Sequence, residues 1–345
     1  VAARVLFKRF CSPVFEIMGC EGAQAALAYC LLTFLNPGDE VIITDPGYFF
    51  LETAVILAGG RIRKIFLSKE NHYRILPESL EKLITRRTKV IILCDPINPF
   101  GTIQTEEELK EIVRIANKHD IIVLDNITHG FHRLNPKARH FPMSTLQGID
   151  LKNVITIAGL SHGFGLAGLR VGFLAGHPRL LGVVMATKSA LTRINLSLPA
   201  QYAAIAALKD KHYLSRCEKL LIANLSILKE IIHRNPPLRF VVEPDYGFFV
   251  CVDTSGMKAS SQELTVALLK RKCAIYPSDG LGDTNATTYI RLNFSTPRKR
   301  HFAWLSKALP EAIREAQTGI YRQAVIRFFE SVNTERSKRI VQSIK

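Results

Sequence analysis

Residues 88–101 read TKVIILCDPINPFG, an apolar run followed by a segment rich in proline and glycine. The run from Thr88 to Cys94 has no polar alternation, which is typical of a strand buried on both faces of a parallel sheet. The residues after it have the composition of a loop. In open α/β sheets ligands bind beyond the carboxyl ends of the strands, so this loop is a candidate ligand-binding segment.

Strand-like and helix-like segments alternate on both sides of this stretch. Thr105-x-x-Glu108 is a capping box that opens a predicted helix ending near Lys118. Further helices are predicted at 22–35 and 77–87, and further strands at 40–44, 61–67, 121–125, 154–158 and 171–175. Strands separated by helices predict an α/β fold with a doubly wound, mostly parallel sheet.

The pattern changes after residue 201, where a long helical stretch leads to about Arg234. Strand-like segments at 238–252 and 288–294 then flank a predicted helix, which indicates a smaller C-terminal α+β domain. We therefore place a large domain at 1–205 and a small domain at 206–318. The remaining residues, 319–345, are basic and amphipathic and predict one added helix as a C-terminal extension.

Composition narrows the class of protein. The 345 residues can bury two domains, and the net charge is +16. Lysine and arginine are spread along the chain, which favours a basic solvated surface over a nucleic-acid site. No apolar run reaches the ~20 residues that span a bilayer, so we expect no membrane partner. The seven cysteines lack metal or disulfide spacing, which fits a reducing compartment and a cytoplasmic location.

Three features at strand or helix ends are candidates for ligand binding. Gly22-Ala23-Gln24 begins a helix whose free N–H groups and dipole suit a phosphate, although a plain turn glycine is the alternative. Tyr48 follows a strand and is either a ligand-stacking or a core tyrosine. Asp125 ends the apolar strand IIVLD, where a carboxylate is costly without a partner, so a functional role is favoured.

Residues 159–172 read GLSHGFGLAGLRVG and complete a set of motifs in a known order. Together the motifs resemble the class I/II aminotransferases of fold type I, a family that depends on pyridoxal 5′-phosphate (PLP) and includes 1-aminocyclopropane-1-carboxylate synthase. The resemblance runs from about Val14 to Leu309, and we expect the family's N-terminal arm to lie outside this chain. It implies PLP as cofactor, an α-amino acid or 2-oxo acid as substrate, and a homodimer.

The resemblance also assigns residues to the cofactor and the substrate. Those assigned to PLP are Gly22, Ala23, Gln24, Tyr48, Asn98, Asp125, Thr128, Ser161 and Arg170. Arg170 binds the phosphate with help from Ser161, and Asn98 contacts the ring hydroxyl. Asp125 keeps the pyridine nitrogen protonated, so that the ring can act as an electron sink. Arg291 binds the substrate α-carboxylate as a bidentate partner.

This chain departs from the family pattern at several positions. His162 occupies the position of the Schiff-base lysine, and imidazole forms no stable Schiff base, so PLP would be held noncovalently. Imidazole can still act as a base, with an ordinary pKa near ~6.5. Thr128 replaces the usual tyrosine and Gly159 the usual serine. Clustered departures favour natural divergence over an engineered change at one position.

Three functions remain open from the sequence. The first is a PLP-binding aminotransferase homologue, or pseudoenzyme, whose ordinary transamination is lost or altered. The second is an active transaminase or lyase that uses His162 as its base. The third is the aminotransferase-like domain of a transcription regulator whose DNA-binding module would lie outside these residues.

Overall fold

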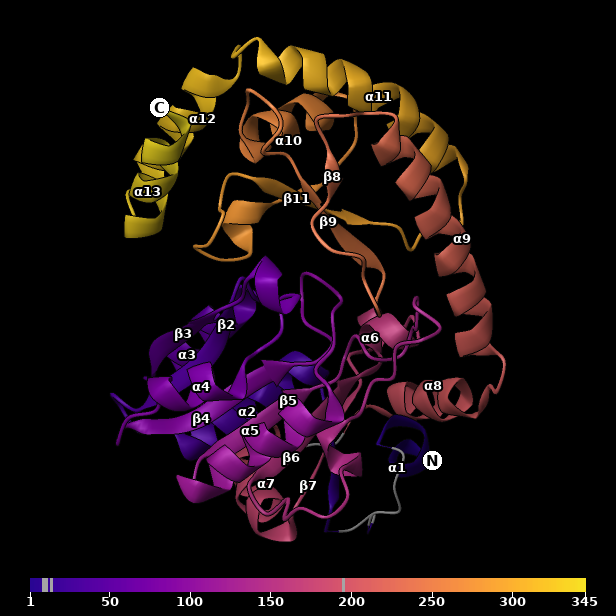
Figure 1. The fold of residues 1–345 in the computed structure, drawn as a ribbon. Coiled ribbons are helices and arrows are strands. Elements are labelled where there is room, and N and C mark those ends of the chain that lie inside the picture. The colour runs from indigo at the N-terminus through magenta and orange to yellow at the C-terminus, as the bar shows by residue number, and fades with distance from the viewer. Residues whose placement is uncertain (8–11, 13–14, 194–195) are drawn as a thin grey trace.

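The computed structural model describes residues 1–345 except 8–11, 13–14 and 194–195 (Figure 1). Val14, where we place the start of the resemblance, lies outside the described residues. The chain forms a lower part built on a seven-stranded sheet and an upper part built on a four-stranded sheet. Helix α1 (Ala2–Leu6) lies beside the lower part.

The large sheet has the strand order β1-β7-β6-β5-β4-β2-β3. Its strands are β1 (Ile17–Cys20), β2 (Glu40–Asp45), β3 (Arg61–Phe66), β4 (Thr88–Cys94), β5 (Ile122–Asn126), β6 (Val154–Gly159) and β7 (Gly172–Gly176). Strands β3, β2, β4, β5 and β6 are parallel, whereas β7 is antiparallel to both of its neighbours. The predicted doubly wound, mostly parallel sheet is therefore confirmed.

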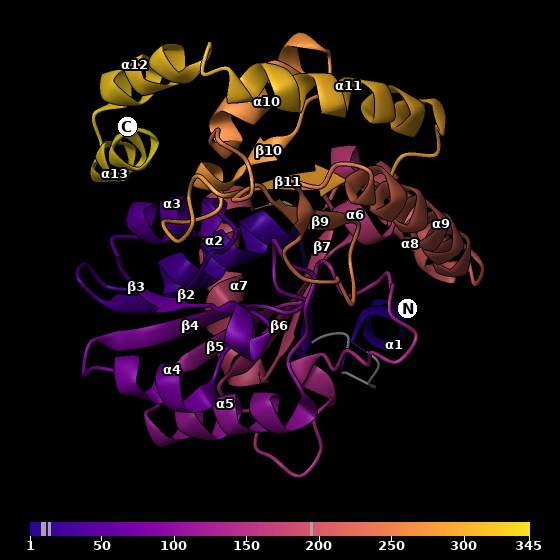
Figure 2. The same cartoon turned by 45° about the horizontal axis from the view of Figure 1, so that its top comes forward.

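Helices cover both faces of the large sheet (Figure 2). They are α2 (Ala23–Phe34), α3 (Phe50–Leu57), α4 (Pro77–Leu83), α5 (Glu106–Lys118) and α7 (Pro178–Thr192), and a short helix, α6 (Leu160–Gly163), directly follows β6. Leu124 of β5 packs with α2 and α7, and its neighbour Val123 packs with α4 and α5 on the other face. Successive strand residues thus enter opposite cores, which explains why the strands are continuously apolar.

The predicted capping box at the start of α5 is confirmed. The backbone N–H of Glu108 donates to the Thr105 hydroxyl at 3.2 Å, and the Glu108 carboxylate accepts from the Thr105 N–H at 2.8 Å. Short 3₁₀ turns lie at η1 (Lys69–Asn71), η2 (Met143–Thr145), η3 (Ala167–Leu169) and η4 (Ser278–Gly280).

The small sheet has the order β10-β11-β9-β8 with antiparallel pairs. Its strands are β8 (Arg239–Phe240), β9 (Phe249–Asp253), β10 (Tyr276–Pro277) and β11 (Tyr289–Asn293), and its helices are α10 (Ser261–Lys270) and α11 (Arg300–Gln317). The long predicted helical stretch is two helices, α8 (Leu198–Lys209) and α9 (Tyr213–His233). Our boundary at residue 205 falls inside α8 and stays a prediction.

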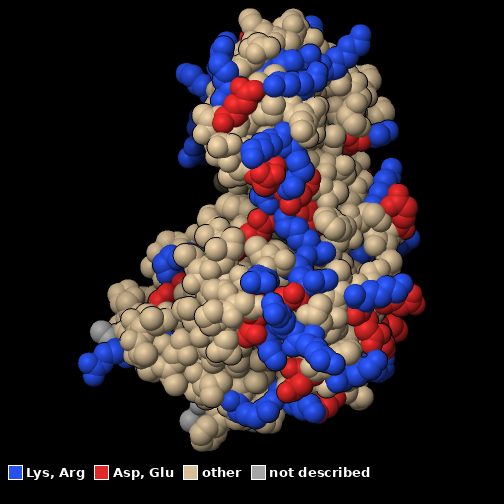
Figure 3. All heavy atoms as spheres, turned by 90° about the vertical axis from the view of Figure 1, so that its left-hand side faces the viewer, with Lys and Arg blue, Asp and Glu red and all other residues tan. Residues whose placement is uncertain are grey.

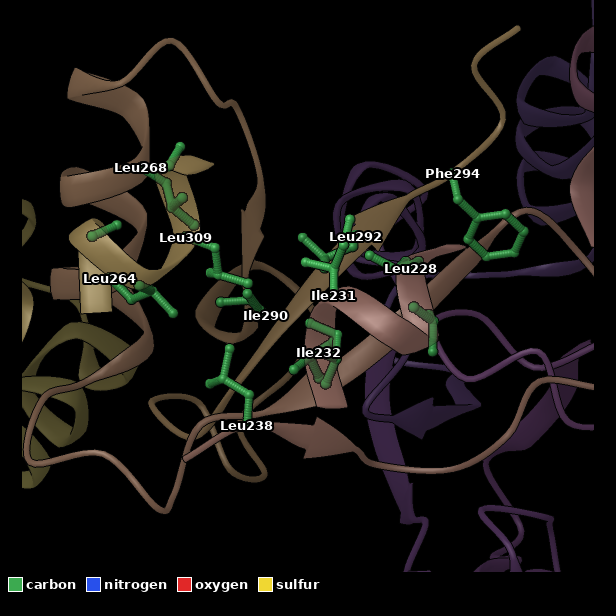
Figure 4. Close-up of a cluster of buried hydrophobic side chains, with 14 of the residues drawn as sticks. Leu228, Ile231, Ile232, Leu238, Leu264, Leu268, Ile290, Leu292, Phe294 and Leu309 are labelled. Atoms are coloured by element: carbon green, nitrogen blue, oxygen red, sulfur yellow. The ribbon is translucent and has the colours of Figure 1, made fainter. Parts of the chain in front are cut away.

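Apolar side chains from α9, α10, α11 and β11 form one core on the face of the small sheet that is turned away from the large sheet (Figure 4). Leu228 and Ile232 come from α9, Leu268 from α10, Leu309 from α11 and Ile290 from β11. Because this core holds β11 rigidly, the strand can carry a functional side chain on its opposite face, toward the large sheet.

The C-terminal segment forms two helices, α12 (Arg322–Val332) and α13 (Glu335–Ile344), rather than the one that we predicted. Asn333 ends α12 in the left-handed region at φ 49°, and the Thr334 hydroxyl caps α13 by accepting from the N–H of Ser337. Phe329 and Ile340 belong to a shared apolar core, so the two helices form a hairpin.

An ionic network joins this hairpin to both parts of the molecule. Arg336 of α13 donates to both carboxylate oxygens of Glu52 on α3 at 2.7 Å and to Asp283, just before β11, at 2.7 Å. Lys64 of β3 binds Asp283 at 2.6 Å, Glu52 at 2.8 Å and Asp45 at 3.0 Å. Figure 3 shows charged side chains of both signs gathered where the upper and lower parts meet.

Arg336→Ala should destabilise the folded chain, because it leaves Glu52 and Asp283 with one cation fewer in a half-buried network. We expect the free energy of unfolding in urea to fall by about 1–3 kcal/mol. Lys338→Ala is the matched control: it lies on the same helix, and its partner Glu335 is exposed. Equal effects of the two substitutions would contradict a structural role for the network.

Within the part of the chain that the structure describes, no helix combines the length and the apolar character needed to cross a membrane.

Candidate functional site

A cavity of about 590 Å³ lies between the carboxyl ends of the large sheet's strands and the small sheet. Nine of the eleven residues predicted from the sequence line it: Ala23, Gln24, Tyr48, Asn98, Thr128, Ser161, His162, Arg170 and Arg291. A cavity of about 700 Å³ lies against α9 and α11, but its wall is largely apolar and contains none of these residues. We therefore place the candidate site in the cavity of about 590 Å³.

One end of this cavity is an anion cradle at the start of α2. Gly22, with φ at +90°, is the N-cap of α2, and a Cβ there would lie 2.6 Å from Nη2 of Arg170. The other terminal nitrogen of Arg170 donates to the hydroxyl of Ser161 at 3.3 Å and to the carbonyl of Ala167 at 2.9 Å. A guanidinium held beside a helix N-terminus suits a phosphate. Gly22 thus belongs to the site although it does not line the cavity.

Arg291 of β11 forms the second cationic end of the cavity. Its Nη1 donates to Oδ1 of Asn98 at 3.0 Å, and its guanidinium lies over the rings of Tyr276 at 4.8 Å and Phe249 at 5.0 Å. Burial lowers the pKa of Arg291 from its ordinary value. The Asn98 bond and the rings fix the guanidinium while leaving donors free to bind a carboxylate.

Two stacked imidazoles form the wall between these ends. The rings of His129 and His162 have centroids 5.4 Å apart at an interplanar angle of 25°, and Phe248 lies 5.1 Å from His162. Nε2 of His129 lies 3.4 Å from Nδ2 of Asn98, so it accepts from that amide. Burial lowers the pKa of His129 to about 3, and desolvation with nearby Arg291 and Arg170 lowers that of His162. Both rings are therefore neutral near pH 7.

His129→Gln should change the pH dependence of stability. An unfolded histidine takes up a proton below about pH 6.5, whereas His129 in the folded chain does so only near pH 3. The unfolded state therefore binds more protons in this window, and stability is lost as the pH falls. The variant should show a slope of unfolding free energy smaller by up to about 1.4 kcal/mol per pH unit between pH 6 and 4. The free energy of unfolding is measured by urea titration at several pH values. The same pH dependence in wild-type protein and His129→Gln would contradict the prediction.

The structure does not bring Asp125 into the cavity. Its Oδ2 accepts from the N–H of Met143 at 2.8 Å and from the hydroxyl of Thr156 at 3.0 Å. Burial raises the pKa of Asp125 to about 7. The next residue, Asn126, lines the cavity instead. Side chains alternate along β5, so those of Asp125 and Asn126 leave the strand on opposite faces. The assignment of Asp125 to the cofactor stays a prediction.

Comparisons with known proteins show the family of this chain. A sequence model of the family "Aminotransferase class I and II" matches residues 9–301. The chain belongs to the class I and II aminotransferase family. It is 32% identical over 288 residues to "Asparagine--oxo-acid transaminase" of Streptococcus mutans, covering 81% of this chain and 72% of that protein. It is 28% identical over 289 residues to "Aspartate aminotransferase" of Pyrococcus abyssi, with 82% and 72% covered.

Among solved structures, the aromatic aminotransferase from Pyrococcus horikoshii OT3 matches with a TM-score of 0.82 and 25% identity, covering 91% of this chain and 83% of that one. The predicted fold type I is thus confirmed. Class I and II aminotransferases are PLP-dependent and act on amino acids and 2-oxo acids.

Several residues of this aminotransferase-family cavity were missed in the sequence. Phe248 and Phe249 lie in the segment predicted as strand, and Tyr276 lies on β10, but no motif marks them. Asn126 directly follows the run IIVLD, and this position at the end of a predicted strand is the only sequence signal that it could line the cavity. His129 directly follows Thr128 but belongs to no motif, and its contact with Asn98 depends on the fold.

Proposed function

We propose that this aminotransferase-family chain binds PLP noncovalently together with an α-amino acid or 2-oxo acid, and that ordinary transamination is lost or altered. One observation carries the proposal: the imidazole of His162, at the Schiff-base lysine position, projects into the cavity that holds Arg170 and Arg291. No lysine among the described residues lines that cavity. The described part of its wall therefore offers no side-chain amine that could bond to the cofactor.

The remaining residues fit PLP at its two polar ends. Gly22 leaves room for the Arg170 guanidinium where a Cβ would collide with it. Ser161 and the free N–H groups of α2 complete a phosphate site of the kind found at helix N-termini. The buried Nδ1 of His129 has no hydrogen-bond partner among the described residues, which indicates that part of the wall is completed by a ligand.

When bound, PLP supplies an electron sink for bonds at the α-carbon of an amino acid. The residues of this chain would bind the cofactor and orient the substrate. Arg170 holds the phosphate, and Arg291, fixed by Asn98, holds the substrate carboxylate. Tyr48, which lines the same cavity, would pack against the ring of the cofactor. The neutral ring of His162 can accept a proton but forms no stable bond with an aldehyde.

His162 as a base supports a second candidate, an active transaminase or lyase. Because desolvation lowers its pKa, His162 is unprotonated near pH 7, as a general base must be. This candidate predicts turnover of an amino acid once PLP is added, whereas the first predicts binding without turnover.

We also propose a homodimer, in keeping with the family. Apolar side chains stand exposed on α7 and α8 of the single chain: Val183, Met185, Leu191, Leu198, Tyr202 and Ile205. A second copy would cover such side chains. Light scattering on the eluted protein should give twice the chain mass.

One experiment separates the two candidates. The protein is titrated with PLP by absorbance, and the loaded protein is then given a panel of amino acids with 2-oxoglutarate. We expect saturable PLP binding and no transfer of amino groups beyond that of free PLP at the same concentration. Turnover above this control would favour His162 as a working base, and absence of saturable binding would contradict the proposal.

A further inference from the structure

A pocket of about 240 Å³ lies where the lower and upper parts of the molecule meet, outside the cavity of the candidate site. The pocket and that cavity have no lining residue in common. Tyr73 and Phe100 line the pocket from the lower part, and Phe240 and Tyr289 line it from the upper part. Because its walls come from both parts, an occupant would contact both at once.

Tyr289 of β11 lines this pocket and carries a hydroxyl without a partner. The residue is 3% exposed, and its hydroxyl has no hydrogen-bond partner among the described residues. A buried hydroxyl without a partner costs free energy, which indicates a group that a ligand completes. Burial also raises the pKa of Tyr289 well above its ordinary value, so the hydroxyl stays protonated and can donate to an anion.

The charged residues of the lining favour an anion as the ligand. They are two cations, Lys69 and Arg239, and one carboxylate, Asp253. The carboxylate is already bonded: its Oδ2 accepts from Nε of Arg239 at 2.8 Å, and its Oδ1 accepts from the N–H of Ser255 at 2.8 Å. Arg239 uses Nε in this bond, so its terminal nitrogens can donate to a ligand. Both cations are exposed, which places them at the rim of the pocket.

Aromatic rings form much of the remaining wall. The rings of Tyr73 and Phe100 stack with centroids 3.9 Å apart, and Phe100 lies 6.1 Å from the ring of Tyr289. Phe240 of β8 adds a further ring. Such a wall favours a ligand with an apolar body over an inorganic anion. The volume is below the ~300–1,000 Å³ that drug-sized ligands occupy, which limits the ligand to a small metabolite.

We propose that this pocket binds a small organic carboxylate with an apolar body. The hydroxyl of Tyr289 donates to the carboxylate, Arg239 and Lys69 balance its charge from the rim, and the apolar body packs against the rings. The proposal does not depend on PLP, because the pocket is separate from the candidate site.

The ligand would lie beside two segments that also serve the candidate site. Tyr289 is two residues before Arg291 on the same face of β11, and Phe100 is two residues after Asn98. Arg291 and Asn98 are bonded to each other. An occupant of the pocket would therefore restrain both segments and stabilise the folded chain.

The test uses phenylacetate as the probe and phenylacetamide, which has the same shape without the charge, as the control ligand. Isothermal titration into wild-type protein should show that phenylacetate binds several times more tightly than the amide. Tyr289→Phe lacks only the hydroxyl and should bind phenylacetate about tenfold more weakly or less, as expected for one hydrogen bond to a charged group. Equal binding of the two ligands by wild-type protein would overturn the anionic class of the ligand.

Two further variants serve as controls. Tyr246→Phe loses a hydroxyl that accepts from the N–H of His140 outside the pocket, and it should keep the wild-type affinity for phenylacetate. Arg291→Ala removes the carboxylate-binding arginine of the candidate site and should also keep it. Without ligand, Tyr289→Phe should melt at or above the wild-type temperature, because the substitution removes an unpaired polar group. A lower melting temperature would mean that the hydroxyl has a partner in the protein and would overturn the proposal.

The outcomes separate this pocket from the candidate site. If wild-type protein does not bind phenylacetate, or if Tyr289→Phe binds it as tightly as wild-type protein does, the proposal is overturned. If Arg291→Ala abolishes binding while Tyr289→Phe keeps it, the carboxylate occupies the candidate site instead, so the proposal is overturned and the proposed function stands.

Discussion

His162→Lys should convert reversible PLP binding into covalent attachment that borohydride makes permanent. The substitution puts a primary amine where the imidazole now faces Arg170 and Arg291 across the cavity. Desolvation and these two cations lower the pKa of His162, and the same surroundings would lower that of a lysine. A larger share of the amine would then be neutral and able to attack the PLP aldehyde.

This effect should be all or none. After PLP and borohydride, a peptide containing residue 162 should carry the pyridoxyl group in His162→Lys and carry none in His162→Gln, which has no amine. A lysine variant that binds PLP but stays unlabelled would contradict the placement of His162 at the aldehyde.

Arg170→Ala should lower the affinity for PLP by about 100-fold or more. Arg170 is the cation at the helix N-terminus beside Gly22, and charge-assisted hydrogen bonds are worth about 1.5–3 kcal/mol each. Losing two such bonds costs about 3 kcal/mol or more, which corresponds to at least about two factors of ten in the dissociation constant. Isothermal titration of the wild-type and variant proteins measures the change.

Pyridoxal, which lacks the phosphate, is the control for this prediction. If Arg170 acts on the phosphate, wild-type protein and Arg170→Ala should bind pyridoxal equally weakly. Arg179→Ala, a change on the solvent-exposed surface, should leave PLP affinity unaltered. Equal losses for PLP and pyridoxal would indicate a damaged fold rather than a phosphate site.

The large sheet could be predicted in detail because its signals are local. The strand Thr88–Cys94 was predicted with its observed bounds, and the capping box at Thr105 and Glu108 marked the start of α5. Asn98 and Arg170, which belong to the sequence motifs, also line the cavity of the candidate site. In each case the signal lies within a few neighbouring residues, and the same residues form the local structure.

The face of β5 on which Asp125 lies could not be predicted from the sequence. Helices cover both faces of the sheet, so Val123 and Leu124 are equally apolar and the sequence contains no alternation that tells one face from the other. The motif resemblance assigns Asp125 to the cofactor but assigns no role to the neighbouring Asn126, which lines the cavity. In the structure, Met143 and Thr156 bind Oδ2 of Asp125.

Other features depend on contacts that no local pattern encodes. The bond between Arg291 and Asn98 joins residues 193 positions apart. The C-terminal hairpin was read as one helix because the left-handed turn at Asn333 interrupts an otherwise continuous amphipathic pattern. Its bond to Glu52 on α3 spans 284 positions and follows only from the assembled fold.

The central claim is that this chain holds PLP without a covalent bond, and mass spectrometry after borohydride tests it most directly. Wild-type protein saturated with PLP is reduced, denatured and weighed. We predict that the denatured chain keeps its unmodified mass, while equilibrium dialysis of the native protein shows bound PLP. A pyridoxyl group fixed at one specific lysine would contradict the claim.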